Sequence, residues 1–272
     1  MIKHIFSDMD GTLLNDRGDL TATNQALIQS AHIPITLVSA RSPKQMAAAI
    51  EALNLTAPQV GFNGGLIYQM VDGQPRVIED RPIDNAVVQK IMRLLAAHFP
   101  NVSISLYDLT NWYVTQIDDG VEHLGKIMPQ GPIVKSTDEL IADMPTIYKI
   151  TFTILNYDVM TGVMALLNDA SLPGAAVQAS SHVYLDITNE AAKKSRGVRY
   201  IADYEKLDLQ DTAAFGDGPN DLPMLRLVGR PIVMGNGLDE VKAGADRITD
   251  DNEHDGVGRG IHKFILEDGK TK

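Results

Sequence analysis

The stretch Met1-Ile-Lys-His-Ile-Phe-Ser-Asp-Met-Asp-Gly-Thr12 determines how the rest of the chain is interpreted. Its apolar half contains no turn residue and predicts a buried β-strand that ends near Ser7. Residues two apart in an extended chain face the same side, so we expect Asp8 and Asp10 to point into one crevice. Gly11 permits a sharp turn of the backbone beneath them.

Two carboxylates so close together repel each other, and a hard, oxygen-preferring dication relieves the repulsion. Mg²⁺ is the candidate because proteins bind it through a few carboxylates and a substrate phosphate. The pair is then interpreted as a catalytic nucleophile, Asp8, with an acid/base, Asp10. A D-x-D pair alone is weak evidence in an acidic protein, and its position between an apolar strand and Gly-Thr strengthens it considerably.

The composition limits the classes of function. The chain has 272 residues, enough for about two domains, and its 44% hydrophobic and 22% charged residues are ordinary for a globular protein. A net charge of -11 disfavours partners such as nucleic acids and anionic membranes, because both are polyanions. The lack of cysteine excludes disulfides, cysteine-bound zinc and thiol catalysis.

The chain shows neither a signal-peptide pattern nor an apolar run long enough to span a bilayer. We therefore expect a cytoplasmic protein, and a monomer or a weak homo-oligomer.

A second strand, Ile35 to Val38, is predicted to end at Ser39-Ala40-Arg41. The following helix begins with Ser42 as its N-cap, Pro43 at the first helical position and Gln45 three residues after the cap. A hydroxyl, a guanidinium and a helix N-terminus together could bind an anion. Taken alone, the stretch is better explained as a strand end followed by a solvated arginine.

Asp72-Gly73 between two apolar runs predicts a β-hairpin, and the polar stretch around Pro82 is typical of a linker. We expect a core domain in two parts, 1–82 and 189–272, interrupted by an α+β domain over 83–188. Trp112 and Tyr113 could stack on a substrate, but aromatic residues at strand spacing more often belong to a core. In the insert, helices are predicted over 87–99 and 159–170, and strands over 102–107, 112–116, 148–155, 176–178 and 183–187.

After the insert, Lys193 and Lys194 precede a predicted helix, and a short apolar strand then leads into Gly216-Asp-Gly-Pro-Asn-Asp221. If Pro219 opens a helix, Asp217 lies just before its N-terminus. An acidic helix cap explains this stretch equally well when it is considered alone. Further strands are predicted over 231–234 and 247–249, and a final helix over 257–266.

Strands alternating with helices predict an α/β fold, a Rossmann-like parallel sheet flanked by helices, and such sheets bind ligands beyond the carboxyl ends of their strands. The predicted strand ends carry two kinds of polar side chain, carboxylates and a hydroxyl, and a helix adds the ammonium of Lys194. This set can position a phosphoryl group and neutralise its charge. The residues at the strand ends are Asp8, Asp10, Ser39 and Asp217.

The chain resembles the haloacid dehalogenase superfamily, and most closely its Cof-type phosphatases with a large α/β cap. Its motifs are similar in order and type: DMDGT (8–12), LVSAR (37–41), a lysine at 194 and GDGPND (216–221). FNGGLIY (62–68), MGNG (234–237) and DDNEHDGV (250–257) are similar too. Ala40 and Ser195 stand where the family usually has glycine, and Lys193 leaves the lysine motif ambiguous by one position.

The resemblance implies a magnesium-dependent phosphatase that acts on a small phosphorylated metabolite through an aspartyl phosphate. Asp8 would be the nucleophile and Asp10 the acid/base. It implies that Arg41 lies near the boundary between core and cap. Phosphate or substrate would be bound by Gly11, Ser39, Ala40, Arg41, Lys194 and Asn220, and the metal by Asp8, Asp10 through its backbone carbonyl, Asp217 and Asp221, the last as a direct or indirect ligand.

Two other functions stay open at this point. A phosphomutase or phosphotransferase acting on sugar phosphates shares the core and cap layout, and differs in releasing no phosphate. A phospho-receiver signalling protein also surrounds an aspartate with acidic residues, a hydroxyl and a lysine, but would be about half as long and lack the second aspartate and the cap.

Overall fold

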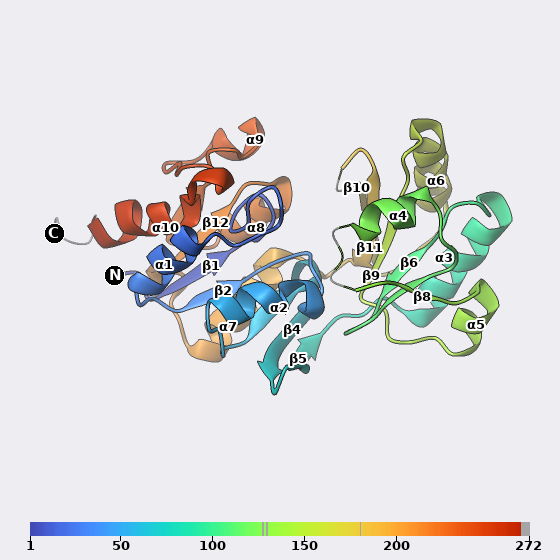
Figure 1. The fold of residues 1–272 in the computed structure, drawn as a ribbon, viewed down its shortest axis with the longest axis horizontal. Coiled ribbons are helices and arrows are strands. Elements are labelled where there is room, and N and C mark those ends of the chain that lie inside the picture. Colours follow the sequence, from blue (N-terminus) through green and yellow to red (C-terminus); the bar gives the residue numbers. More distant parts are fainter. Residues whose placement is uncertain (127, 129, 180, 268–272) are drawn as a thin grey trace. The chain divides into compact units, whose positions relative to one another are not determined.

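The computed structural model of the chain describes residues 1–126, 128, 130–179 and 181–267 (Figure 1). These residues form two compact units. Unit 1 contains residues 1–41 and 46–78 and the described chain from Lys193 onwards, whereas unit 2 contains Ser42–Gln45 and Glu79–Ala192. The insert expected over 83–188 lies within unit 2.

Unit 1 is built on a parallel sheet with the strand order β13-β12-β1-β2. Every residue of β1, β2 and β12 is buried, as in parallel sheets that are covered on both faces. The predicted buried strand before Asp8 is therefore confirmed, and it lies between β12 and β2. The strands span His4–Ser7 (β1), Ile35–Leu37 (β2), Thr212–Gly216 (β12) and Arg230–Val233 (β13).

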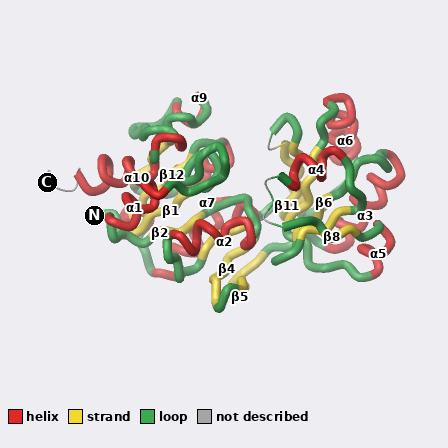
Figure 2. The backbone as a smooth tube through the Cα atoms, in the orientation of Figure 1, coloured by secondary structure: helices red, strands yellow, loops and turns green. Residues whose placement is uncertain are grey.

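Helices cover both faces of this sheet (Figure 2). Phe6 and Ala214 pack with Val198 of α7 on one face, whereas α10 approaches the other face, where a Cβ on Gly260 would lie 2.7 Å from the Phe215 ring. Helix α1 packs against α10. The expected α/β fold is thus confirmed. The helices span Ala22–Ser30 (α1), Pro43–Ala52 (α2), Lys194–Glu205 (α7), Leu222–Leu225 (α8), Asp239–Lys242 (α9) and Gly256–Ile261 (α10).

The predicted hairpin is confirmed, and its turn residues Asp72 and Gly73 have positive φ angles of 50° and 74°. It extends an antiparallel sheet of β3 (Gln59–Gly61), β4 (Leu66–Val71) and β5 (Gln74–Asp80). A parallel bridge between Val38 and Val60 places β3 beside the end of β2. The stretch after β3 is therefore next to the stretch after β2.

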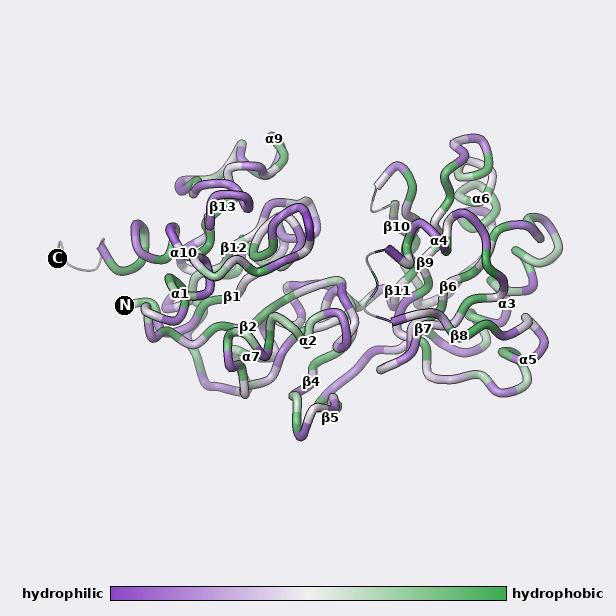
Figure 3. Tube along the Cα trace, in the orientation of Figure 1, coloured by the Kyte–Doolittle hydropathy of each residue, from purple (hydrophilic) through white to green (hydrophobic). Residues whose placement is uncertain are grey.

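Unit 2 contains a mixed sheet in the order β10-β11-β9-β6-β7-β8, antiparallel except for the β7–β8 pair. Helices α3, α5 and α6 contribute to one apolar core with alternate residues of β6, β9 and β11, and α6 is mainly hydrophobic (Figure 3).

Trp112 is buried and the Tyr113 hydroxyl donates to Asp108, which supports a structural role for both. The elements span Asn85–His98 (α3), Ser105–Tyr107 (β6), Trp112–Val114 (β7), Asp119–Gly125 (α4), Ile133–Val134 (β8), Thr137–Ala142 (α5), Lys149–Thr153 (β9), Tyr157–Asp169 (α6), Ala175–Ala179 (β10) and Tyr184–Asn189 (β11).

Several predicted elements need correction. Residues 247–249 are not a strand, because Ile248 makes only an isolated bridge to Val233. The final helix is α-helical only from Gly256 to Ile261. From His262 to Glu267 it is a π-helix. Elements α4, β8 and α5 were not predicted, since each is too short for a clear periodic pattern.

His4 is the titratable residue of strand β1, and its side chain is buried. Its side chain is 1% exposed, its Nε2 lies 2.9 Å from the Thr36 hydroxyl, and its Nδ1 lies 3.1 Å from a carboxylate oxygen of Glu205. Burial lowers the pKa of His4 to about 4 and raises that of Glu205. The folded protein therefore holds His4 neutral where an unfolded chain would protonate it.

We expect the stabilising effect of neutral His4 to be complete above pH 6.5 and to be lost as the pH falls from there towards 4. Between pH 7 and 5 the loss amounts to about 2 kcal/mol of unfolding free energy. Urea unfolding of the parent and of His4→Gln at both pH values measures it. His98→Gln, at an exposed helix end, should keep the parent's pH dependence. Equal pH dependence in the parent and His4→Gln would contradict the prediction and would mean that Glu205 stabilises a protonated His4.

Candidate active site

The carboxyl ends of the core strands bring together polar residues that are distant in sequence. Asp8 follows β1, Ser39 lies two residues beyond β2, and Asp217 follows β12. The backbone N–H of Asp8 donates to Phe215 at 3.1 Å, which keeps the chain in register with β12 just before Asp217. The expected convergence at one edge of the sheet is thus present in unit 1.

Lys194, the first residue of α7, lies at the centre of this site. Its Nζ is 2.5 Å from Asp8 Oδ1 and 2.6 Å from Asp221 Oδ1, and its side chain is 1% exposed. Lys193 is exposed. The ambiguity between the two lysines is therefore resolved structurally, because only Lys194 is directed into the carboxylate cluster.

Asp221 is held by the turn that follows β12. Its Oδ2 accepts from the backbone N–H groups of Asp217 and Gly218, each at 3.0 Å, while its Oδ1 accepts from Lys194. Pro219 opens a 3-10 turn over Pro219–Asp221 that continues into α8. Asp221 thus combines the cap role with a place in the cluster, so the two interpretations of this stretch are compatible.

Gly11 and Thr12 determine how closely the first motif approaches Asp217. Gly11 has a φ of +73°, and a Cβ at this position would lie 2.5 Å from Asp217 Oδ2. Only glycine fits that conformation and that distance without strain. The buried Thr12 hydroxyl donates to Asp217 Oδ1 at 2.8 Å. Thr12 was quoted in the motif without a role, and its contact identifies it as a residue that orients Asp217.

The buried charges shift one another's pKa values. Burial raises the pKa of Asp8 well above its usual range and Asp221 adds to the rise, while Lys194 opposes it. Burial also raises the pKa of Asp217, against the hydrogen bond from Thr12. Burial alone would lower the pKa of Lys194, but Asp221 and Asp8 raise it overall, so it stays an ammonium. Asp8, Asp217 and Asp221 offer carboxylate oxygens within 4.8 Å of one another and could hold a metal ion.

Asp10 does not share the orientation of Asp8, contrary to the expectation of a common crevice for their side chains. Its side chain is 60% exposed and forms an ion pair with Arg41, with Nη2 2.6 Å from Oδ1. The two-residue alternation fails because β1 already ends at Ser7 and the chain turns at Met9. The Asp10 carboxylate is therefore outside the metal-compatible group, and a role for its backbone carbonyl stays a prediction.

The remaining predicted anion-binding residues surround the end of β2. Ser39 is buried, and its Oγ accepts from the backbone N–H of Arg41 at 3.2 Å. Ala40, next to it, is half-buried. The Asn220 amide lies 3.4 Å from the Asn63 amide oxygen, and the backbone N–H of Asn63 donates to Ser39 at 2.8 Å. Asn63 was not predicted as a site residue, and the Asn-Gly-Gly sequence directly after a predicted strand is the signal that could have drawn attention to it. In the structure Asn63 has a positive φ of 58°.

Two further asparagines stabilise the loop that carries the first motif. Asn236 donates to the Gly11 carbonyl at 2.8 Å and accepts from the backbone N–H of Asn252 at 3.1 Å. The buried Asn252 amide donates to Leu14 and Asp16. Through these contacts the MGNG and DDNEHDGV segments hold the DMDGT turn and the loop that follows it from outside.

A sequence model of the haloacid dehalogenase-like hydrolase family matches residues 5–261. The chain therefore belongs to this family, which confirms the resemblance to the superfamily and its Cof-type phosphatases, and it is an enzyme of the phosphoric monoester hydrolase class. A Bacillus subtilis relative, the 5-amino-6-(5-phospho-D-ribitylamino)uracil phosphatase YitU, is 28% identical over 95% of this chain and 96% of its own.

Solved structures support the fold. A haloacid dehalogenase-like hydrolase from Bacteroides thetaiotaomicron has a TM-score of 0.87 at 23% identity, covering 97% of this chain and 100% of that one. TM0651 from Thermotoga maritima has a TM-score of 0.85 at 20% identity, covering 97% and 98%. In the part of the chain that the structure describes, none of the helices has the length and apolar character that crossing a membrane requires.

Proposed function

We propose that the chain hydrolyses small phosphomonoesters with the help of Mg²⁺, through an acyl phosphate on Asp8. The observation that carries this proposal is the cluster of buried Asp8 and Asp221 with half-buried Asp217, in which the Lys194 ammonium is paired with Asp8 and Asp221. Such a group can position a phosphoryl dianion, but only if its own negative charge is balanced.

The residues present fit a magnesium ion. Three carboxylates and one ammonium leave two uncompensated negative charges, and all the donors are hard oxygens. Both oxygens of Asp221 already accept hydrogen bonds, so Asp8 and Asp217 would bind the ion and Asp221 would hold Lys194. When bound, the ion would supply positive charge for the phosphoryl oxygens.

In the first half-reaction, a carboxylate oxygen of Asp8 attacks phosphorus, the bond from phosphorus to the ester oxygen breaks, and Asp10 gives its proton to the leaving alcohol. In the second, water attacks the phosphorus of the aspartyl phosphate, Asp10 takes the water's proton, and Asp8 leaves as a carboxylate with inorganic phosphate. The Arg41 guanidinium orients Asp10 in both steps. Ser39, Lys194 and Asn220 would bind the phosphoryl oxygens.

The substrate class is a small phosphorylated metabolite, a sugar phosphate or a phosphorylated cofactor. The named activity of the Bacillus relative, removal of phosphate from a ribityl group, supports such compounds. A panel of phosphomonoesters assayed for released inorganic phosphate tests the proposal. Transfer of phosphate between sugar positions without net release would instead indicate the phosphomutase.

Removal of the metal is expected to abolish phosphate release, because repulsion within the cluster would then oppose a phosphate dianion. The measurement compares initial rates before EDTA, in excess EDTA and after excess Mg²⁺ is added back. Calcium, which is larger and more weakly polarising, serves as the control ion. An undiminished rate in EDTA would contradict the metal requirement.

We further propose that the insert over 83–188 governs substrate choice. Its sheet buries Ile150, Phe152, Leu185 and Ile187 in the helical core, so alternate residues face the opposite side. There the Thr151 hydroxyl donates to Asp186 at 2.6 Å, which makes this face polar.

Asp186→Asn is expected to change the ranking of substrates by about tenfold in kcat/KM, because it removes a charged hydrogen-bond acceptor without changing the chemistry of unit 1. Full rate profiles over the phosphomonoester panel measure this. Asp169→Asn, at the exposed end of α6, is the matched control. Identical rankings in the parent and Asp186→Asn would count against selection by this face.

A cytoplasmic location and a monomeric or weakly associated state stay predictions.

A further inference from the structure

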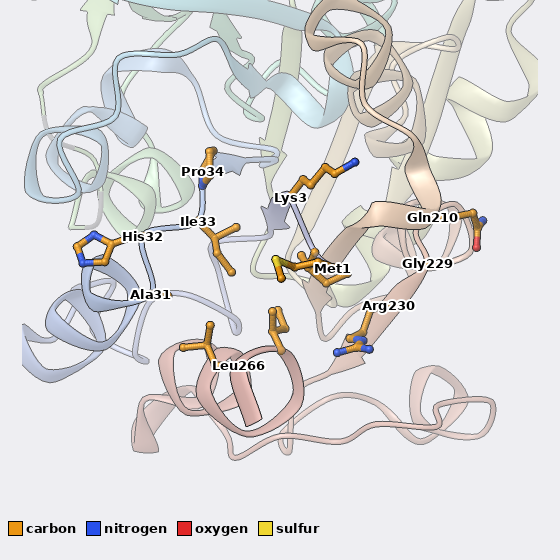
Figure 4. Close-up of a pocket in the computed structure, with 12 residues that line it drawn as sticks. Met1, Lys3, Ala31, His32, Ile33, Pro34, Gln210, Gly229, Arg230 and Leu266 are labelled. Atoms are coloured by element: carbon orange, nitrogen blue, oxygen red, sulfur yellow. The ribbon is translucent and has the colours of Figure 1, made fainter. Parts of the chain in front are cut away.

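A cavity of about 670 Å³ lies in unit 1, away from the carboxylate cluster (Figure 4). Its lining comes from the segment before β1, the turn between α1 and β2, the start of β13 and the π-helix. The first three of these segments precede or open strands, whereas the catalytic carboxylates follow strands. The cavity therefore opens at the amino-terminal edge of the sheet, and its volume is typical of sites for small molecules.

The cavity has mainly apolar walls. Met1, Ile33 and Leu266 point towards its centre (Figure 4), and Ile2, Pro34 and Ile265 complete this surface. An apolar molecule that lay against these side chains would lose part of its contact with water, which favours binding. The walls therefore fit the body of a hydrophobic ligand.

One side of the cavity carries a cation with unused hydrogen-bonding capacity, Arg230. One of its N–H groups donates from Nη1 to the Phe264 carbonyl, which ties the guanidinium to the π-helix at one side of the cavity (Figure 4). Lys3, the other strong base of the lining, is paired with Asp211 at 2.7 Å and points away from the cavity (Figure 4). Among the described residues that line the cavity there is no carboxylate.

This cation lies at an apolar wall in a chain with a net charge of -11. A guanidinium that has five N–H donors and gives one to a carbonyl can offer others to an anion at the apolar wall. A neutral ligand would gain only the apolar contact, and a strongly polar anion only the guanidinium. The charge and the walls together fit a molecule that has both features.

We propose that this cavity is a second small-molecule site, specific for a compound with an apolar body and a single anionic group such as a carboxylate or sulfonate. Arg230 binds the anionic group, and the apolar walls bind the body. The site is separate from the hydrolytic site and takes no part in the phosphoryl chemistry.

Two fluorescent probes with the same body test the proposal. 8-Anilinonaphthalene-1-sulfonate carries the anionic group, and N-phenyl-1-naphthylamine lacks it. Each probe is titrated into the folded protein and excited directly, and the dependence of its fluorescence on concentration gives the dissociation constant. We expect saturable binding of the sulfonate, and Arg230→Gln should weaken it by about tenfold with little change for the neutral probe. Arg259→Gln, an exposed arginine of α10 that does not line the cavity, should leave both unchanged.

A cavity-filling variant locates the binding. Ile33→Trp places a larger side chain in the cavity and should abolish binding of both probes, while circular dichroism and the melting curve establish that each variant is folded. No saturable binding of the sulfonate up to about 1 mM would overturn the proposal. Retention of binding in folded Ile33→Trp, or an equal loss for both probes in Arg230→Gln, would overturn it as well.

Discussion

Asp8→Asn is expected to reduce phosphate release by about four to six orders of magnitude, the loss typical of a missing nucleophile. The amide keeps the size of the carboxyl and can still contact Lys194, but it is too weak a nucleophile to form the acyl phosphate. Single-turnover assays with a saturating substrate measure the loss. Asp72→Asn, the same substitution at an exposed hairpin turn, should leave the rate unchanged.

The same variant separates the catalytic function of Asp8 from its contribution to folding. The raised pKa of Asp8 means that its ionisation costs stability in the absence of metal, so a neutral amide should leave the protein no less stable in EDTA. Melting curves in EDTA measure this, with the parent as reference. A clear fall in melting temperature would mean that the attraction between Lys194 and the Asp8 carboxylate stabilises the protein more than repulsion among the carboxylates destabilises it.

Much of the site could be predicted because of where the strands end. Asp8, Ser39 and Asp217 follow apolar runs. The carboxyl ends of parallel strands meet at one edge of the sheet, independent of the loop conformations. Lys194 was predicted from its motif, but its buried position between two carboxylates depends on the packing of α7. The sequence therefore indicated which residues meet. It did not indicate how burial and the neighbouring charges shift their pKa values.

The residues that were missed act through contacts that no local pattern encodes. Thr12 meets Asp217 across 205 positions, and Asn63 meets Asn220 across 157. The outward orientation of Asp10 depends on the position of Arg41, which lies in the loop after β2. Some local signals were available: Ser136 and Glu139 form a capping box that begins α5, a helix the periodicity did not reveal.

Asp10→Asn is expected to separate the two half-reactions. The amide cannot give a proton to the leaving alcohol or take one from water. A substrate with a good leaving group, such as an aryl phosphate, needs little protonation, so Asp8 should still become phosphorylated. Attack of water on the aspartyl phosphate loses its base and should slow by about 10²- to 10⁴-fold.

The phosphoenzyme should therefore accumulate in Asp10→Asn, and rapid quenching with radiolabelled substrate followed by mass spectrometry should locate the phosphate on Asp8. An acyl phosphate is identified by its lability to alkali and hydroxylamine. Arg41→Gln is a matched test of the ion pair: it leaves Asp10 able to transfer protons but removes the group that orients it, so both half-reactions should slow together and no phosphoenzyme should build up. Unchanged turnover in Asp10→Asn would remove Asp10 from the acid/base role. If a folded Asp10→Asn never carries phosphate on Asp8, even in a single turnover of the aryl ester, the phosphate must pass directly to water and the covalent mechanism is wrong.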